Sequence, residues 1–176
     1  DRFFSTYCGY GEIVEFRLQT ETVAGGFERE ALAWRQVGKL SSSGEQATTG
    51  DVDNDGRVEL ILAQGFQEGN AEIRIFELTD DPATLKLDLS IDESHRYTNV
   101  RFLLIPGTNG VGSELVAWWS HDLGGGYCEV IRYRLGPMGV TDRVYIGQGT
   151  DLWPSDGQMS LADVEGSGIP SVWFST

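Results

Sequence analysis

Three aspartates at alternate positions, Asp51, Asp53 and Asp55, are the clearest group of residues that could do chemistry. Gly56 follows them directly and permits the sharp reversal of the chain that would bring three carboxylates around one centre. Carboxylate oxygens are hard ligands and suit a hard cation. The spacing therefore predicts a cation site, and the alternative interpretation is a solvated acidic turn.

The residues after the aspartates indicate which cation and which kind of loop. The backbone carbonyl of Arg57 and the carboxylate of Glu59 bring the set to the six or so oxygens that calcium takes, whereas magnesium demands stricter octahedral geometry. An EF-hand begins with the same D-x-D-x-D-G pattern, but its twelfth position should be a glutamate and is Leu62 here. The flanking residues resemble strands, so a calcium loop between two strands is predicted.

The loop belongs to an internal repeat. Three segments align without gaps, and they begin at Asp51 (DVDNDGRVELILA), Gly107 (GTNGVGSELVAWW) and Asp163 (DVEGSGIPSVWFS). Their shared glycines are 56 residues apart, at Gly56, Gly112 and Gly168. A short apolar stretch of strand length follows each glycine, so each copy predicts a turn followed by a strand.

Further strands lie between the loops. Three related segments begin at Glu12 (EIVEFRL), Glu72 (EIRIFEL) and Glu129 (EVIRYRL), and alternation of apolar and polar residues predicts strands there and from Leu85 to Ile91. The stretch from Gln19 to Leu40 is the best helical candidate, but its flanking glycines favour a strand. Each unit then holds about four strands, the content of a propeller blade.

We therefore predict an all-β fold, a β-propeller-type repeat of four-stranded antiparallel blades. About three blades with a 56-residue period fit in residues 1–176, and the phase suggests that the chain starts with the last two strands of one blade and ends with the first two of another. Propellers typically close with four to eight blades, so other propeller segments or further copies of the chain in a homo-oligomer could complete the ring. An unusually small closed form is the third alternative.

The sequence GDVDNDGRVELIL resembles the FG-GAP (VCBS-type) repeat of integrin α-subunit propellers, whose loop reads D-x-D-x-D-G-x-x-D/E between two strands. The resemblance implies that residues 1–176 form one FG-GAP-like β-propeller domain or a segment of a larger propeller. It also implies one set of calcium ligands, which consists of Asp51, Asp53, Asp55, the Arg57 carbonyl and Glu59.

The other two copies of the repeat have fewer of these ligands. The third copy keeps oxygens but fewer charges, so we expect a weaker second site there, at Asp163, Glu165, Ser167 and Ser171. The middle copy has almost no ligands at the corresponding positions, which are Gly107, Asn109, Val111 and Leu115. That middle loop is expected to hold no metal.

Charge and cysteine content narrow the function. Asp and Glu number 27 against 13 Lys and Arg, a net charge of -14, so nucleic acid and anionic membranes are poor partners. No apolar run is long enough for a membrane helix, and residues 1–176 do not begin with the pattern of a signal peptide, so we expect a mature form or a piece of a longer protein. Cys8 and Cys128 lack metal-binding spacing, and we expect two unpaired, buried thiols.

A search for catalytic residues yields little. Only His95 and His121 could act as imidazole bases, and neither lies in a recognisable nucleophile motif. Aromatic side chains offer flat surfaces for a ligand, so we expect ligand contacts from Trp119, His121 and Trp153. We favour a non-catalytic protein on these grounds.

The FG-GAP resemblance implies a calcium-stabilised extracellular binding module, secreted or at the cell surface, lectin-like or active in cell adhesion. Its ligand would be a glycan or a protein. Two alternatives stay open at this point. One is the propeller part of a polysaccharide-degrading enzyme, a lyase or hydrolase, and the other is a structural scaffold of a larger secreted protein or toxin.

Overall fold

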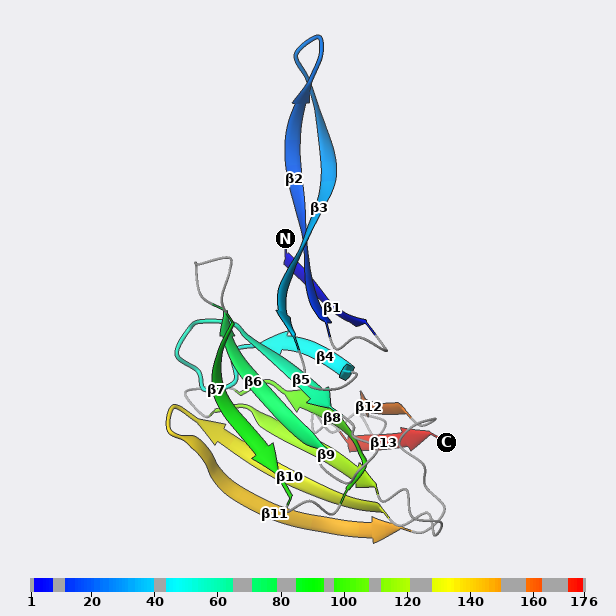
Figure 1. Ribbon diagram of the computed structural model, residues 1–176. Coiled ribbons are helices and arrows are strands. Elements are labelled where there is room, and N and C mark those ends of the chain that lie inside the picture. The colour runs from blue at the N-terminus through cyan, green and yellow to red at the C-terminus, as the bar shows by residue number, and fades with distance from the viewer. Residues whose placement is uncertain are drawn as a thin grey trace.

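The computed structural model describes residues 2–7, 12–39, 44–64, 71–78, 85–93, 97–107, 112–120, 128–149, 158–162 and 171–175 (Figure 1). These residues form strands joined by turns and contain no helix, so the all-β prediction is confirmed. Among them there is accordingly no helix long and apolar enough to cross a membrane.

The strands of the described residues form four antiparallel sheets. The first sheet contains β1 (Arg2–Tyr7), β2 (Glu12–Val23) and β3 (Phe27–Lys39). The second contains β4 (Gly44–Gly50), β5 (Glu59–Gln64), β6 (Glu72–Leu78) and β7 (Leu85–Asp92). The third contains β8 (Asn99–Ile105), β9 (Glu114–Ser120), β10 (Cys128–Gly136) and β11 (Gly139–Gly149). The fourth contains β12 (Gln158–Ala162) and β13 (Ser171–Ser175).

Each sheet is a meander in which every strand pairs with its neighbour in sequence. The predicted four-stranded antiparallel unit is therefore present twice, as the second and third sheets. The related segments EIVEFRL, EIRIFEL and EVIRYRL are the equivalent strands β2, β6 and β10. The first sheet differs from the expectation, because β1 gives it three strands and not two.

The stretch from Gln19 to Lys39 is strand, as predicted, and it forms most of a long hairpin. β2 and β3 have 12 and 13 residues and pair from Glu12 to Lys39, so the hairpin extends well beyond the other sheets (Figure 1). Gly25 and Gly26 form its tip with φ values of 96° and 78°, a left-handed conformation that glycine adopts without steric cost.

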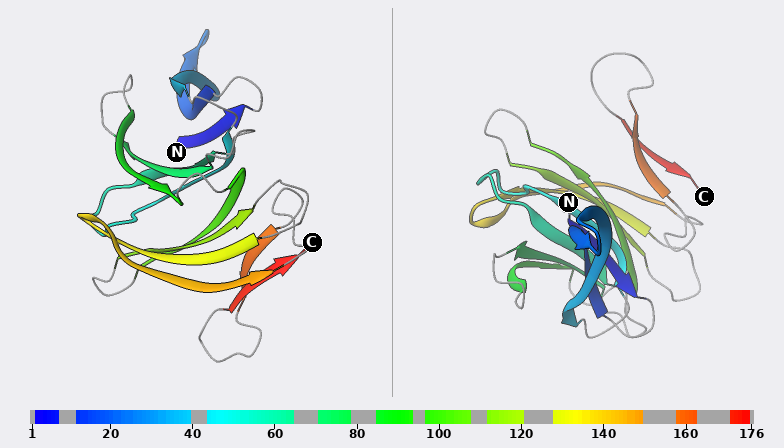
Figure 2. Two further views of the ribbon diagram at one scale, coloured as in Figure 1. Left: turned by 60° about the horizontal axis from the view of Figure 1, so that its bottom comes forward. Right: turned by 90° about the horizontal axis from the view of Figure 1, so that it is seen from above.

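The main core lies between the second and third sheets, which pack face to face (Figure 2). The second sheet contributes alternate residues of β5 and β6, and the third contributes alternate residues of β9 and β10. The buried members include Ile61, Ala63, Ile73, Ile75, Leu115, Ala117, Trp119, Ile131 and Tyr133. The opposite face of the second sheet has its own buried cluster, made of Leu60, Leu62 and Phe76.

The packing defines which residues of the two sheets are equivalent. Glu59 begins β5 and pairs with Gly50, the last residue of β4, and Glu114 begins β9 and pairs with Ile105, the last residue of β8. Glu114 therefore takes the position of Glu59, which corrects the gapless 56-residue alignment that put Leu115 there.

The corrected alignment shows which faces of the second and third sheets pack against each other. With Glu59 and Glu114 equivalent, Leu60 corresponds to Leu115. Leu60 lies on the face of the second sheet that points away from the third, whereas Leu115 lies on the face of the third sheet that points toward the second. The sheets are consequently stacked front to back, in the same sense.

The first strands of the two sheets are joined by a side chain. Gln46 of β4 donates from Nε2 to the Phe102 carbonyl at 2.7 Å, and its Oε1 accepts from the Phe102 N–H at 2.9 Å. β4 and β8 belong to different sheets and form no backbone ladder with each other. The Gln46 amide thus supplies the two hydrogen bonds that a neighbouring strand would otherwise provide.

Cys128 is a free, buried thiol at the start of β10, as expected for a small apolar residue. Its Sγ donates to the Gly149 carbonyl at 3.4 Å. Cys8 lies outside the described residues.

We predict that Ile61→Ala lowers the free energy of unfolding by about 2 to 5 kcal/mol, because it leaves a cavity in the core between the second and third sheets. Ile61 is fully buried, whereas Val144 of β11 is 36% exposed. Val144→Ala serves as the control and should cost less than about 1 kcal/mol. Urea denaturation measures both, and equal losses would show that this core does not stabilise the fold.

Candidate metal centre

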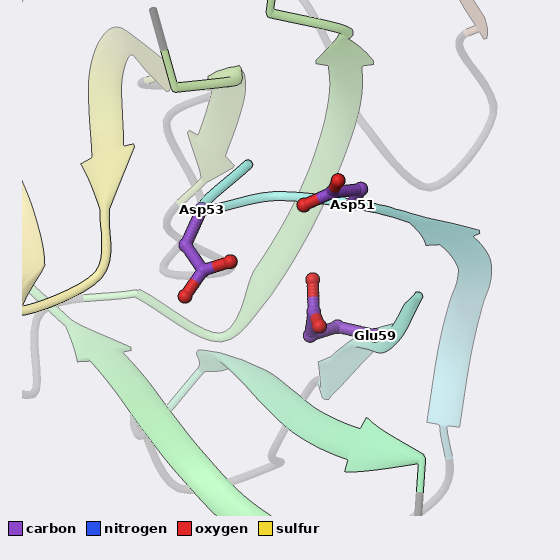
Figure 3. Close-up of side chains that lie close together, drawn as sticks. All are labelled: Asp51, Asp53 and Glu59. Atoms are coloured by element: carbon purple, nitrogen blue, oxygen red, sulfur yellow. The ribbon is translucent and has the colours of Figure 1, made fainter. Parts of the chain in front are cut away.

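The acidic loop connects β4 to β5 and brings three carboxylates together. Asp51 and Asp53 come from the loop and Glu59 is the first residue of β5, and the three side chains surround one small space (Figure 3). One oxygen from each carboxylate lies within 4.8 Å of the others. This triad could hold a metal ion, and all its side-chain donors are hard oxygens.

The loop backbone folds around Asp51. Asn54 has a φ of 64° and Gly56 a φ of 87°, so the chain passes twice through the left-handed region that asparagine and glycine tolerate best. This path directs backbone N–H groups at the carboxylates. Asp55 N–H donates to Asp51 Oδ1 and to Asp53 Oδ1, both at 3.1 Å, and Gly56 N–H donates to Asp51 Oδ2 at 3.0 Å.

Glu59 is the buried member of the triad, with only 4% of its surface exposed. Its Oε2 accepts the Val52 N–H at 2.8 Å. The pKa of Glu59 is raised to about 7, mainly because the group is buried; the negative charges of Asp53, Asp55 and Asp51 act in the same direction, and the Val52 hydrogen bond opposes them. The site therefore has a local excess of negative charge that a cation would neutralise.

Asp55 is turned away from this triad and toward Arg57. Its Oδ2 accepts from Arg57 Nε at 2.8 Å and from Nη2 at 2.6 Å, and its Oδ1 accepts the Arg57 N–H at 2.8 Å. These hydrogen bonds lower the pKa of Asp55. Arg57 also forms an ion pair with Glu77 of β6. Of the five predicted ligands, three are brought together, Asp55 is paired with Arg57, and the Arg57 carbonyl remains a prediction.

The equivalent position in the third sheet is neutralised by an arginine. Glu114 Oε1 accepts from Arg134 Nη2 at 2.7 Å and from Nε at 3.2 Å, and these bonds raise the pKa of Arg134. Arg134 pairs with Glu114 across β9 and β10, as Glu77 pairs with Glu59 across β5 and β6. Arg134 of the third sheet thus takes the position that Glu77 has in the second sheet, and a positive charge replaces a negative one there.

The other predicted site residues have different outcomes. Ser171 is the exposed first residue of β13 and pairs with Ala162, the position that Glu59 has in the second sheet. Its proposed partners in the weaker site, Asp163, Glu165 and Ser167, lie outside the described residues.

Trp119 is one of the predicted ligand contacts, and the structure places it in the core instead. Trp119 is fully buried in the core, with its ring centroid 5.6 Å from that of Tyr97 and 6.5 Å from that of Tyr133. It packs between sheets and offers no surface to a ligand, because it lies on the inner face of β9. His121 and Trp153 lie outside the described residues.

Ser113 contacts the acidic loop but is not part of the loop motif. Ser113, in the connection before β9, donates from Oγ to the Asp51 carbonyl at 2.8 Å and from N–H to the Val52 carbonyl at 3.0 Å. The motif is confined to one loop, and Ser113 is 62 residues away from Asp51. Only the packing of the third sheet brings them together.

Comparison of the chain with protein-family models, with curated proteins and with solved structures finds no match. The site is therefore interpreted from its own geometry.

We predict that Arg57→Gln raises the affinity for calcium by roughly two- to fivefold, because it removes a positive charge and releases Asp55 toward the triad. Arg132→Gln is the matched control, since it removes the same charge from β10 of the third sheet. Calorimetric titration with calcium compares the two variants. A lower affinity in Arg57→Gln, or the same change in both variants, would show that Arg57 does not compete with the cation.

Proposed function

We propose that the chain is a calcium-stabilised, non-catalytic binding module and a segment of a β-propeller of the FG-GAP type. The observation that carries the proposal is the convergence of Asp51, Asp53 and Glu59 where the first two strands of a four-stranded antiparallel sheet are joined. This is the place where the FG-GAP resemblance puts the calcium loop.

Calcium is the cation that this donor set fits best. The three side chains supply oxygen only, with no histidine or cysteine sulfur to favour zinc or copper. The loop is irregular and its donors come from both a turn and a strand, which suits the flexible coordination of calcium better than the strict octahedron of magnesium. Asp55 adds a further carboxylate if it exchanges Arg57 for the cation.

The arrangement of the sheets supports the propeller part of the proposal. Two complete meanders are stacked front to back, as successive blades of a propeller are. The first strands of successive units lie next to one another, since β4 contacts β8 and β8 contacts β12. Innermost blade strands have this relation around a propeller axis.

In this proposal calcium stabilises the fold, and the ligand is a glycan or a protein bound by the propeller outside the cell, at the cell surface or in the secreted state. The net charge of -14 supports a ligand other than nucleic acid or an anionic membrane.

We expect one tight calcium per chain and at least roughly tenfold weaker binding in Asp53→Asn, because affinity falls with the charge of the ligands. Asp142→Asn makes the same chemical change on exposed β11 and should bind like the wild type. Calorimetry with calcium, and with magnesium as competitor, measures both. An absence of uptake in the wild type, or unchanged uptake in Asp53→Asn, would contradict the proposed site.

Chelation should lower the melting temperature of the wild type, because a ligand that binds only the folded state stabilises it by mass action. Calcium at a hundred times its dissociation constant contributes about 2.7 kcal/mol. Scanning calorimetry with and without a chelator measures this difference, and Asp53→Asn should show little of it. If the melting temperature does not respond to calcium, calcium does not stabilise the fold.

A further inference from the structure

The acidic loop is attached to the third sheet through Ser113. Ser113 is 1% exposed and uses all its polar groups in the junction. Its Oγ donates to the Asp51 carbonyl at 2.8 Å and accepts the Gly107 N–H at 3.1 Å. Its N–H donates to the Val52 carbonyl at 3.0 Å, and its carbonyl accepts the Leu135 N–H at 2.9 Å. One residue thus connects the loop to both ends of the β8 to β9 connection and to β10.

Val52 is the residue that these bonds fix, and it lies between two members of the triad. Its N–H donates to Glu59 Oε2, and its carbonyl accepts from Ser113. Its side chain is 3% exposed and belongs to the core between the second and third sheets. The backbone that spaces Asp51 from Asp53 is therefore held from the second sheet on one side and from the third on the other.

The neighbouring glycine keeps Ser113 in place. A Cβ atom at Gly112 would lie 1.8 Å from the Leu135 carbonyl oxygen, so only glycine allows this close approach to β10. The close contact between Gly112 and β10 thus lies next to the two donors that Ser113 presents to the loop.

We propose that Ser113 is a positioning residue for the cation site, and that cation binding is coupled to the packing of the third sheet against the second. This inference rests on the proposed function. Ligands that are held in place before the cation arrives bind it more tightly, because less ordering accompanies binding. Coupling is reciprocal, so the bound cation also strengthens the hydrogen bonds between loop and third sheet.

The first test is Ser113→Ala in the full chain, titrated with calcium. We expect affinity to fall by roughly three- to tenfold, because the variant must order the loop when the cation binds, whereas the Ser113 hydrogen bond orders it beforehand in the wild type. Thr141→Ala is the matched control, because it also removes a bond from a hydroxyl to a backbone carbonyl, that of Arg134, in the third sheet. It should bind calcium like the wild type.

A purely structural role would give a different result. Ser113→Ala would then lower the melting temperature equally with and without calcium, and its calcium affinity would stay within twofold of the wild type, which overturns the inference. Coupling predicts instead a smaller calcium-induced rise in melting temperature than in the wild type.

Hydrogen exchange in the wild type provides a second test that needs no variant. Calcium should slow exchange of the Ser113 and Leu135 amides more than that of Ala71, which donates to the Tyr97 carbonyl at another contact between the two sheets. Equal slowing at all three, or none, overturns the inference. If the wild type takes up no calcium at all, the proposed function fails and this inference with it, whereas normal uptake in Ser113→Ala overturns this inference alone.

Discussion

Mutual repulsion among Asp51, Asp53 and Glu59 is the constraint around which the loop and its surroundings are organised. Their oxygens come within 4.8 Å of one another, and Glu59 is screened little by water because it is buried. Backbone N–H groups of the loop offset part of this repulsion, and Arg57 holds the Asp55 carboxylate apart from the others. A divalent cation would offset the remainder, so cation binding and the order of this loop depend on the same charges.

The two complete sheets respond to this constraint differently. In the second sheet Glu59 faces Glu77 across the strand pair, and no arginine reaches it among the hydrogen bonds of the described residues. In the third sheet Glu114 faces Arg134, which donates two hydrogen bonds to it. In the third sheet the positive charge of Arg134 therefore neutralises Glu114. In the second sheet the corresponding carboxylate, Glu59, belongs to a triad that could hold an external cation. Ser113 connects the acidic loop of the second sheet to the third sheet.

Much of the fold could be predicted from the sequence, because period-two alternation and glycine turns act locally. Side-chain placement depends on contacts that no motif contains. Shifting an alignment by one residue moves every side chain of a strand to the other face, and for this reason the gapless repeat pairs Leu115 with Glu59. The expectation of a ligand contact at Trp119 fails because both faces of β9 are covered, so that Trp118 and Trp119 are both buried. Asp55 follows the loop motif, but Arg57, two residues later, supplies three hydrogen bonds that compete with the predicted arrangement.

A crystal structure of the calcium-soaked chain, with anomalous diffraction data, would show directly whether the three carboxylates bind calcium. We expect one strong anomalous peak among Asp51, Asp53 and Glu59, with carboxylate oxygens at about 2.3 to 2.6 Å and with Asp55 turned from Arg57 toward the ion. A map without a peak there, in which Asp55 keeps its bonds to Arg57, would show that the three carboxylates are not a calcium site.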